Sequence, residues 1–199
     1  MPVLKRRNNN EKEDAVKILQ RNKWALKITI LTFLISILFS LFSETVLEQS
    51  DILSALFILL VIIIIGIFFD IIGVAVTASS EIPFLSMASR KIPGAKQSII
   101  LIRNAHLVSS ICNDVVGDIC GIISGAAGAV ISIKIITNDL SINSALISIL
   151  ISSIIASATV GGKAFGKSFA MNNKTVIVHK VGYVIYLLGS ITKGKHKRK

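Results

Sequence analysis

The hydrophobic positions of this chain are gathered into long blocks that polar segments separate. Uncharged apolar runs cover residues 28–43, 52–69 and 140–162, and each is close to the roughly 20 residues that a helix needs to cross the bilayer core. A further block, residues 106–130, is mostly apolar or small but contains two acids and an asparagine. The pattern predicts an all-α integral membrane protein. Its four transmembrane helices are expected at about residues 24–42, 52–78, 104–133 and 141–160.

The basic residues lie outside these blocks and set the expected topology. The chain has 22 Lys and Arg against 11 Asp and Glu, and the basic residues concentrate at both ends and in segment 79–103. Segment 43–51 has no Lys or Arg, and segment 134–142 has only Lys134. Because cytoplasmic loops are enriched in Lys and Arg, both termini are expected in the cytosol, with the protein in the plasma membrane. Few aromatics accompany the basic residues, so membrane lipid is the expected partner and nucleic acid is not.

Three regions follow from this topology. Residues 1–23 are expected to form a cytosolic amino-terminal segment, and residues 24–173 the transmembrane domain. Residues 174–199 are expected to form an interfacial helix with a polybasic tail, KGKHKRK, which the anionic inner leaflet attracts.

Small residues recur at every fourth position of the third and fourth spans. Such rows place small side chains on one helix face and allow a neighbouring helix to approach closely. The residues expected to pack helices in this way are Gly117, Gly121, Gly125, Ser153 and Ser157. A homodimer is also expected.

Polar side chains inside the spans do not follow from packing alone. Asp114 and Asp118 repel each other if both are ionised, unless a cation or a base lies between them. Asp70 lies about 27 Å along the second span, near its inner end, and Asn113 lies in the inner part of the third. The spans therefore bring oxygen ligands together in the inner half of the membrane, and such ligands suit magnesium or calcium.

Residues 161–168, GGKAFGKS, fit the phosphate-loop pattern G-x-x-x-x-G-K-[ST]. That pattern binds nucleotide when a buried strand precedes it, a helix follows it and a nucleotide-binding domain surrounds it. Here an uncharged run of membrane-span length precedes it, so we interpret it as a membrane exit with interfacial lysines. The sequence shows no nucleophile with a neighbouring base. We therefore expect neither an enzyme nor an organic cofactor.

Three short motifs in order resemble the transmembrane domain of the cyclin M and CorC (CorB) family of magnesium and divalent-cation transporters. They are TASSE with a later arginine, CND within the next span, and GGKAFGKSFA after another span. The positions matched to the family pattern are Ser80 and Glu81 with Arg90, Asn113 and Asp114, and Gly162 with Lys167. The resemblance covers roughly residues 52–190, so the first span is an addition to the family pattern.

The resemblance implies three spans with a short helical hairpin or belt at the cytosolic face. It also implies a dehydrated-cation site made from serines, the asparagine and backbone oxygens. The chain departs from the family pattern at Cys112, Lys163 and Gly166. The family's regulatory pair of cystathionine-synthase-type domains is not expected, and a regulatory partner would be a separate cytosolic protein.

The sequence thus predicts transport of a divalent, magnesium-like cation through a cytosol-facing polar site, with the ion as substrate. The candidate ligands are Ser79, Ser80, Asn113, Asp114, Asp118 and Gly162. The alternative is a non-transporting scaffold or partner subunit that packs by its Gly and Ser rows. The two acids favour transport, because a scaffold does not need them.

Overall fold

The computed structural model describes most of the chain. It covers residues 26–138 and 144–196, with gaps at residues 28, 31, 39, 42–44 and 46–49. The chain divides into two compact units, Met1–Leu41 and Phe42–Lys199. The described residues of the first unit lie between positions 26 and 41 and are helical. The predicted segment 1–23 and the rest of the first predicted span lie outside the described residues.

Three helical segments of the second unit are long and apolar enough to cross a membrane. They are α2 (Ile52–Ala78), the stretch Ala105–Thr137, and Ser144–Ser190 within α7 (Ser144–His196). The middle stretch is built from α5 (Ala105–Ser109), the π-helix η1 (Ser110–Gly117) and α6 (Asp118–Asn138). Their length and composition indicate a membrane protein, as the apolar blocks predict.

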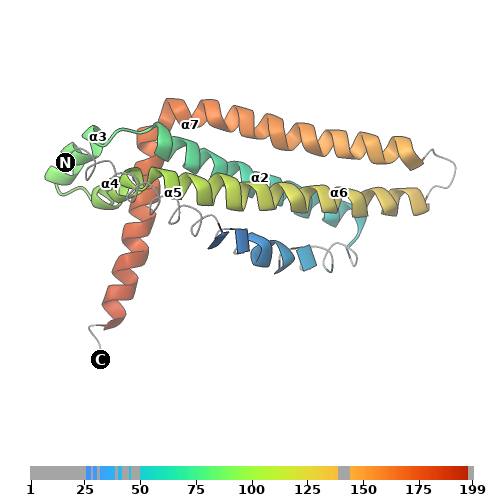
Figure 1. Cartoon of the computed structure of the whole chain (residues 1–199), viewed down its shortest axis with the longest axis horizontal. Helices are drawn as coiled ribbons and strands as arrows, with labels where there is room; N and C mark the ends of the chain where they lie inside the picture. Colours follow the sequence, from blue (N-terminus) through green and yellow to red (C-terminus); the bar gives the residue numbers. More distant parts are fainter. Residues whose placement is uncertain are drawn as a thin grey trace, which may run out of the picture. The chain divides into compact units, whose positions relative to one another are not determined.

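The helices α2, α6 and α7 pack against one another as a three-helix bundle (Figure 1). The helix α2 runs antiparallel to the middle stretch, because Gly66 lies against Cys120 and Gly73 lies against Asn113. In a bilayer, helices associate through close packing and not through a hydrophobic driving force. The close approaches made at these glycines are therefore what holds α2 to η1 and α6.

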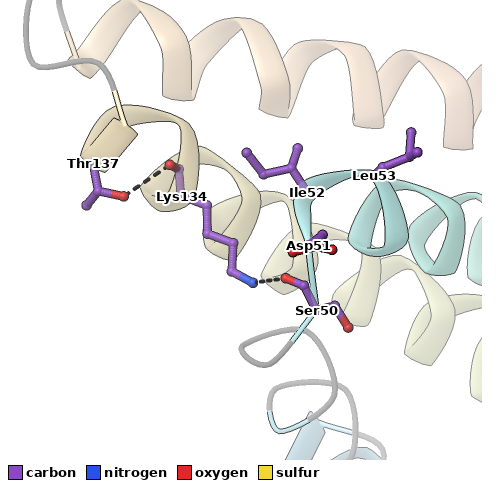
Figure 2. A pocket seen from close by; sticks show the side chains of 6 residues that line it. All are labelled: Ser50, Asp51, Ile52, Leu53, Lys134 and Thr137. Atoms are coloured by element: carbon purple, nitrogen blue, oxygen red, sulfur yellow. Dashed lines mark hydrogen bonds between the residues drawn. The ribbon is translucent and has the colours of Figure 1, made fainter.

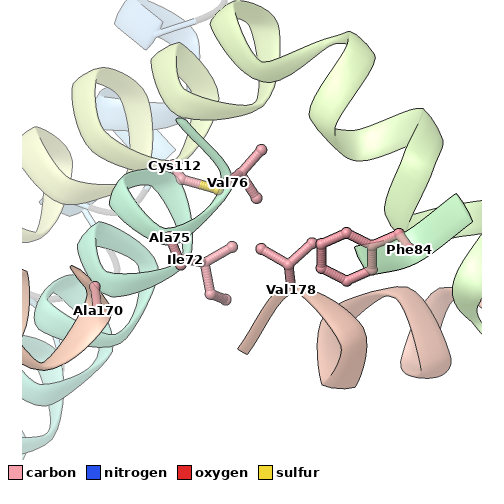
Figure 3. Packing of buried hydrophobic residues seen from close by; sticks show 7 residues of the cluster. All are labelled: Ile72, Ala75, Val76, Phe84, Cys112, Ala170 and Val178. Carbon is pink, nitrogen blue, oxygen red and sulfur yellow. The ribbon is translucent and has the colours of Figure 1, made fainter. Parts of the chain in front are cut away.

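Two apolar clusters mark the two ends of the bundle. The cluster near the start of α2 consists of Ala55, Leu59, Ile63, Ala127, Ile131 and Ile155. The other cluster joins α2, η1, α7 and the short helix α3 (Ile82–Ser89), as Figure 3 shows. Its buried members are Ile72, Ala75, Val76, Phe84, Cys112, Ala170 and Val178.

The segment between the second and third spans contains α3 and α4 (Ala95–Arg103), which contact each other. Pro83 lies in the first turn of α3, where its missing N–H costs nothing. The chain reverses after α3, with Lys91 at φ 58° and Gly94 at φ 87°. Glycine adopts such a positive φ without steric cost.

The helix α7 extends past the predicted end of the fourth span. It continues as helix through residues 161–168, and a kink at Asn173 (φ −113°, ψ 17°) divides it into two helices. The kink coincides with the predicted boundary between the transmembrane domain, which ends at residue 173, and a separate helix from residue 174. The membrane exit and the interfacial position of that helix stay predictions. The backbone over the GGKAFGKS motif is helical throughout. After the kink, the carboxyl-terminal part of α7 turns away from the bundle (Figure 1).

The part of α7 beyond the kink packs on α4 through small residues. The Ser98 hydroxyl is buried and lies 3.0 Å from the Gly94 carbonyl and 3.1 Å from the Val178 carbonyl, so it can donate to either. A Cβ at Gly182 would fall on Ser98 Oγ and lie 2.7 Å from the Gly94 carbonyl. Only a residue without a side chain lets the two helices come this close.

A shallow pocket of about 510 Å³ lies at the opposite end of the bundle (Figure 2). It is lined by Ser50, Asp51, Ile52, Leu53, Lys134 and Thr137. Lys134 Nζ donates to the Ser50 carbonyl at 2.5 Å and so ties the end of α6 to the start of α2.

Gly182→Ala should destabilise the second unit by about 1–3 kcal/mol, because the new methyl group overpacks the α4–α7 contact. Gly189→Ala is the matched control, because a Cβ there meets nothing within 4 Å and alanine has the higher helix propensity. Thermal unfolding in detergent compares the two. Equal melting temperatures for both variants would contradict the close contact at Gly182.

Candidate functional site

One stripe of α2 combines two glycines with a buried acid. Gly66, Asp70 and Gly73 are spaced at i, i+4 and i+7, so they share one face of the helix. All three are buried, and Asp70 is 4% exposed. Its Oδ2 atom has no hydrogen-bond partner among the described residues. Buried polar atoms are nearly always paired, and leaving one unpaired is costly.

The π-helix η1 lies directly against this stripe. A Cβ at Gly73 would fall on Asn113 Oδ1, and a Cβ at Gly66 would lie 2.9 Å from Cys120 Cβ and 3.9 Å from the Gly117 carbonyl oxygen. Asp70 lies between the two glycines on the same face, so it faces the turn from Asn113 to Gly117. π-Helices are rare and occur frequently at functional sites.

Asn113 supplies a second unpaired buried oxygen. Its Nδ2 donates to Ser109 Oγ at 3.2 Å, whereas its Oδ1 is buried and has no hydrogen-bond partner in the described part of the chain. On α2, Asp70 lies about one helical turn before Gly73, the glycine that Asn113 covers. An acid of α2 and an amide of η1 thus lie along the same helix–helix contact.

The third element at this place is Lys163 of α7. Its ammonium donates to the Gly117 carbonyl at 3.3 Å and lies 3.8 Å from Asp118 Oδ1. The Lys163 side chain is 23% exposed and that of Asp118 is 68% exposed. The ion pair is long and one of its partners is mostly exposed, so the main consequence of the contact is the position of the ammonium, at the end of the π-helix.

The predicted metal ligands do not all meet at Asn113. Ser79 Oγ donates to the Ala75 carbonyl at 2.7 Å. Ser79 lies about 9 Å along the α2 axis from Gly73, the residue that Asn113 covers. Ser80 and Asp114 are exposed, and Gly162 packs on the Ile67 side chain. Within the described residues, no group of three or more His, Cys, Asp or Glu side chains is placed to hold a metal ion. A site at Asn113 must therefore use few acids together with neutral oxygens.

The predicted packing row faces α7 but leaves space there. A Cβ at Gly117 would lie 3.5 Å from Lys163 Nζ, whereas a Cβ at Gly121 or Gly125 would meet nothing within 4 Å. Gly121 and Gly125 line a pocket of about 210 Å³ between α6 and α7. Ser153 and Ser157 are exposed, so neither makes the predicted contact with the third span within one chain.

The ion-pair partner of Glu81 is Arg103 and not Arg90, the arginine matched to the family pattern. Nε and Nη2 of Arg103 each donate to Glu81 Oε2 at 3.2 Å, whereas Arg90, the matched arginine, is exposed. The pair joins the start of α3 to the end of α4. Its role in the structure is to close the two short helices on each other.

Sequence reasoning placed Asp70 near the inner end of its span but did not include it among the ligands. The Gly-x-x-x-Asp-x-x-Gly spacing was the available signal, because it puts the acid on a face that a neighbouring helix covers. Lys163 was interpreted as an interfacial lysine, and no local pattern could reveal its contact with a carbonyl 46 residues earlier.

No protein-family model, curated protein or solved structure matches this chain. The likeness to the cyclin M and CorC family is carried by the three short motifs alone.

Gly73→Ala should lower the melting temperature in detergent, because the methyl group takes the position of the Asn113 carboxamide, at a cost of about 1–3 kcal/mol. Gly121→Ala should keep or raise it, because the added Cβ is unobstructed and favours helix. The reverse order would show that α2 does not pack on η1 as described.

Proposed function

We propose that this chain transports a divalent, magnesium-like cation across a membrane through a polar site between α2 and η1. The observation that carries the proposal is the buried, unpaired Oδ1 of Asn113, inside a helix long and apolar enough to span a bilayer. Polar groups at such depth are costly and are commonly functional. A cation bound to this oxygen would supply the missing partner. Amide, carboxylate and carbonyl oxygens are the ligands that magnesium and calcium prefer.

The charge distribution supports an orientation for the proposed transporter. The segment from α3 to α4 carries four exposed bases, Arg90, Lys91, Lys96 and Arg103, and the positive-inside rule places such a segment in the cytosol. We therefore place α3 and α4 as a hairpin at the cytosolic face, with the carboxyl terminus on the same side. The segment of residues 26–41 adds a fourth span, which puts the amino terminus in the cytosol of the plasma membrane as well.

The alternative function, a non-transporting membrane subunit, is favoured by one observation. The pocket at Gly121 and Gly125 continues onto Ser152 and Ala156 of α7, a small-residue surface of the kind that lets a partner helix approach. A second copy of the chain or another membrane protein would fit there. A homodimer is compatible with both functions, as is a separate cytosolic regulatory partner.

Asn113→Ala should reduce magnesium uptake into proteoliposomes by at least about tenfold, because losing an oxygen at a metal site weakens it by this order. Asn172→Ala, an exposed asparagine on α7, is the matched control and should transport like the parent. A magnesium-sensitive dye inside the vesicles gives the rate. A parent protein no faster than protein-free vesicles would favour the non-transporting subunit.

Ser50→Cys and Ser190→Cys should be labelled from opposite sides of the membrane, because α2 begins at one end of the bundle and the end of α7 extends from the other. In a background with Cys112 and Cys120 changed to alanine, an impermeant thiol reagent should reach Ser50→Cys in intact cells. It should reach Ser190→Cys only after permeabilisation. Labelling of both positions in intact cells would disprove the orientation.

A further inference from the structure

Asp70 is the one acid of the described spans that is fully enclosed. It is 4% exposed, whereas Asp114 is exposed and the Asp118 side chain is 68% exposed. Glycines one turn to either side let η1 and α6 close over it. An enclosed carboxylate oxygen without a partner needs a compensating positive charge far more than a solvated one does.

The backbone supplies another oxygen at the same place. The Gly117 carbonyl is directed toward α2, since a Cβ at Gly66 would lie 3.9 Å from its oxygen. That oxygen already accepts a hydrogen bond from the Lys163 ammonium at 3.3 Å. This ammonium also lies 3.8 Å from the Asp118 carboxylate. A carbonyl and a carboxylate oxygen are also ligands of metal cations, so Lys163 marks a position where positive charge is stabilised.

We propose that Asp70, Asn113 Oδ1 and the Gly117 carbonyl form the cation site, and that the Lys163 ammonium competes with the cation for it. This inference rests on the proposed transport function and specifies its site. The donor set is a carboxylate, an amide and a backbone carbonyl, so the ligand class is a hard divalent cation such as magnesium. Asp114 is not a ligand.

Charge balance explains how competition would work. Three charged groups lie in this part of the bundle. The Lys163 ammonium donates to the Gly117 carbonyl, Asp118 Oδ1 lies 3.8 Å from that ammonium, and Asp70 lies on the face of α2 that η1 covers. With the ammonium in place these groups sum to one negative charge, and with it withdrawn they leave two, which matches a divalent cation. The Lys163 side chain is partly exposed, and its flexible stem lets the ammonium move to solvent.

The test is a thermal shift of the purified full chain against magnesium chloride, with choline chloride keeping the ionic strength constant. A cation that binds the folded state alone raises the melting temperature as its concentration rises. Asp70→Asn should abolish the magnesium-dependent shift. Asp51→Asn, the same change at an exposed residue beyond the other end of α2, should retain it. Loss of the shift in Asp114→Asn but not in Asp70→Asn would overturn the proposal.

The lysine is tested by a second matched pair. Lys163→Gln should lower the magnesium concentration of half-maximal shift by at least about tenfold, because a nearby positive charge is removed. Lys167→Gln, one turn later and exposed, should leave that concentration unchanged. Equal effects of the two variants would overturn the competition. This pair also decides the matter if Asp70→Asn does not fold.

Failure of this site and failure of the transport function give different results. Magnesium transport that needs Asn113 but is unaffected in Asp70→Asn would overturn the site and leave the function standing. A parent and a Lys163→Gln variant that neither transport nor respond to magnesium would overturn both.

Discussion

The close approach of α2 to the π-helix η1 is the constraint on which the rest of the bundle depends. Helices in a bilayer gain little from burying apolar surface against each other, so association needs backbones that come near enough for dense packing. Gly66 and Gly73 provide this, and side chains from the middle stretch occupy the space where their own Cβ atoms would stand. Once these two glycines are in contact with Cys120 and Asn113, the residue between them on the same face is enclosed. That residue is Asp70, and its burial follows from the packing of its neighbours.

The same contact separates the polar residues of the spans into two kinds. Asp114 and Asp118 lie on the outer side of the middle stretch and are exposed on the bundle. Asp70 and Asn113 face the helix contact, and each has a buried oxygen with no hydrogen-bond partner among the described residues, so the fold carries their desolvation cost. A protein that only needed to pack could have apolar residues at both positions at lower cost. Exposed and buried polar residues of the spans can be told apart only by their burial in the structure, because both groups contain aspartates.

The apolar block lengths were enough to predict the second and third spans, because a helix that crosses a bilayer has a length set by the bilayer itself. Asn113 could be singled out from its depth, and its role as a site residue stays a prediction. The space around Gly121 and Gly125 could not be predicted, because the spacing of small residues gives the face of a helix but not how closely the neighbouring helix approaches it. The glycines after the fourth predicted span were interpreted as a membrane exit, which stays a prediction. Gly161, Gly162 and Gly166 lie within an unbroken helix, where Gly162 and Gly166 serve close contact with α2. The partner of Lys163 depends on tertiary contact, which a local pattern does not contain.

The two ends of the bundle differ in their cores, and the difference bears on where we propose the polar site. Near the start of α2 the core is entirely aliphatic, and such a core offers no ligand. At the other end, Cys112, the neighbour of Asn113, is buried in one cluster with Phe84 of α3 and Val178 of α7 (Figure 3). The short helices and the kinked part of α7 therefore support η1 from outside the bundle, while the glycines of α2 support it from within. A π-helix has less favourable backbone geometry than an α-helix, and it persists where surrounding structure holds it. The turn of η1 that carries Asn113 is held from both sides in this way. At the aliphatic end of the bundle, the described residues contain no π-helix.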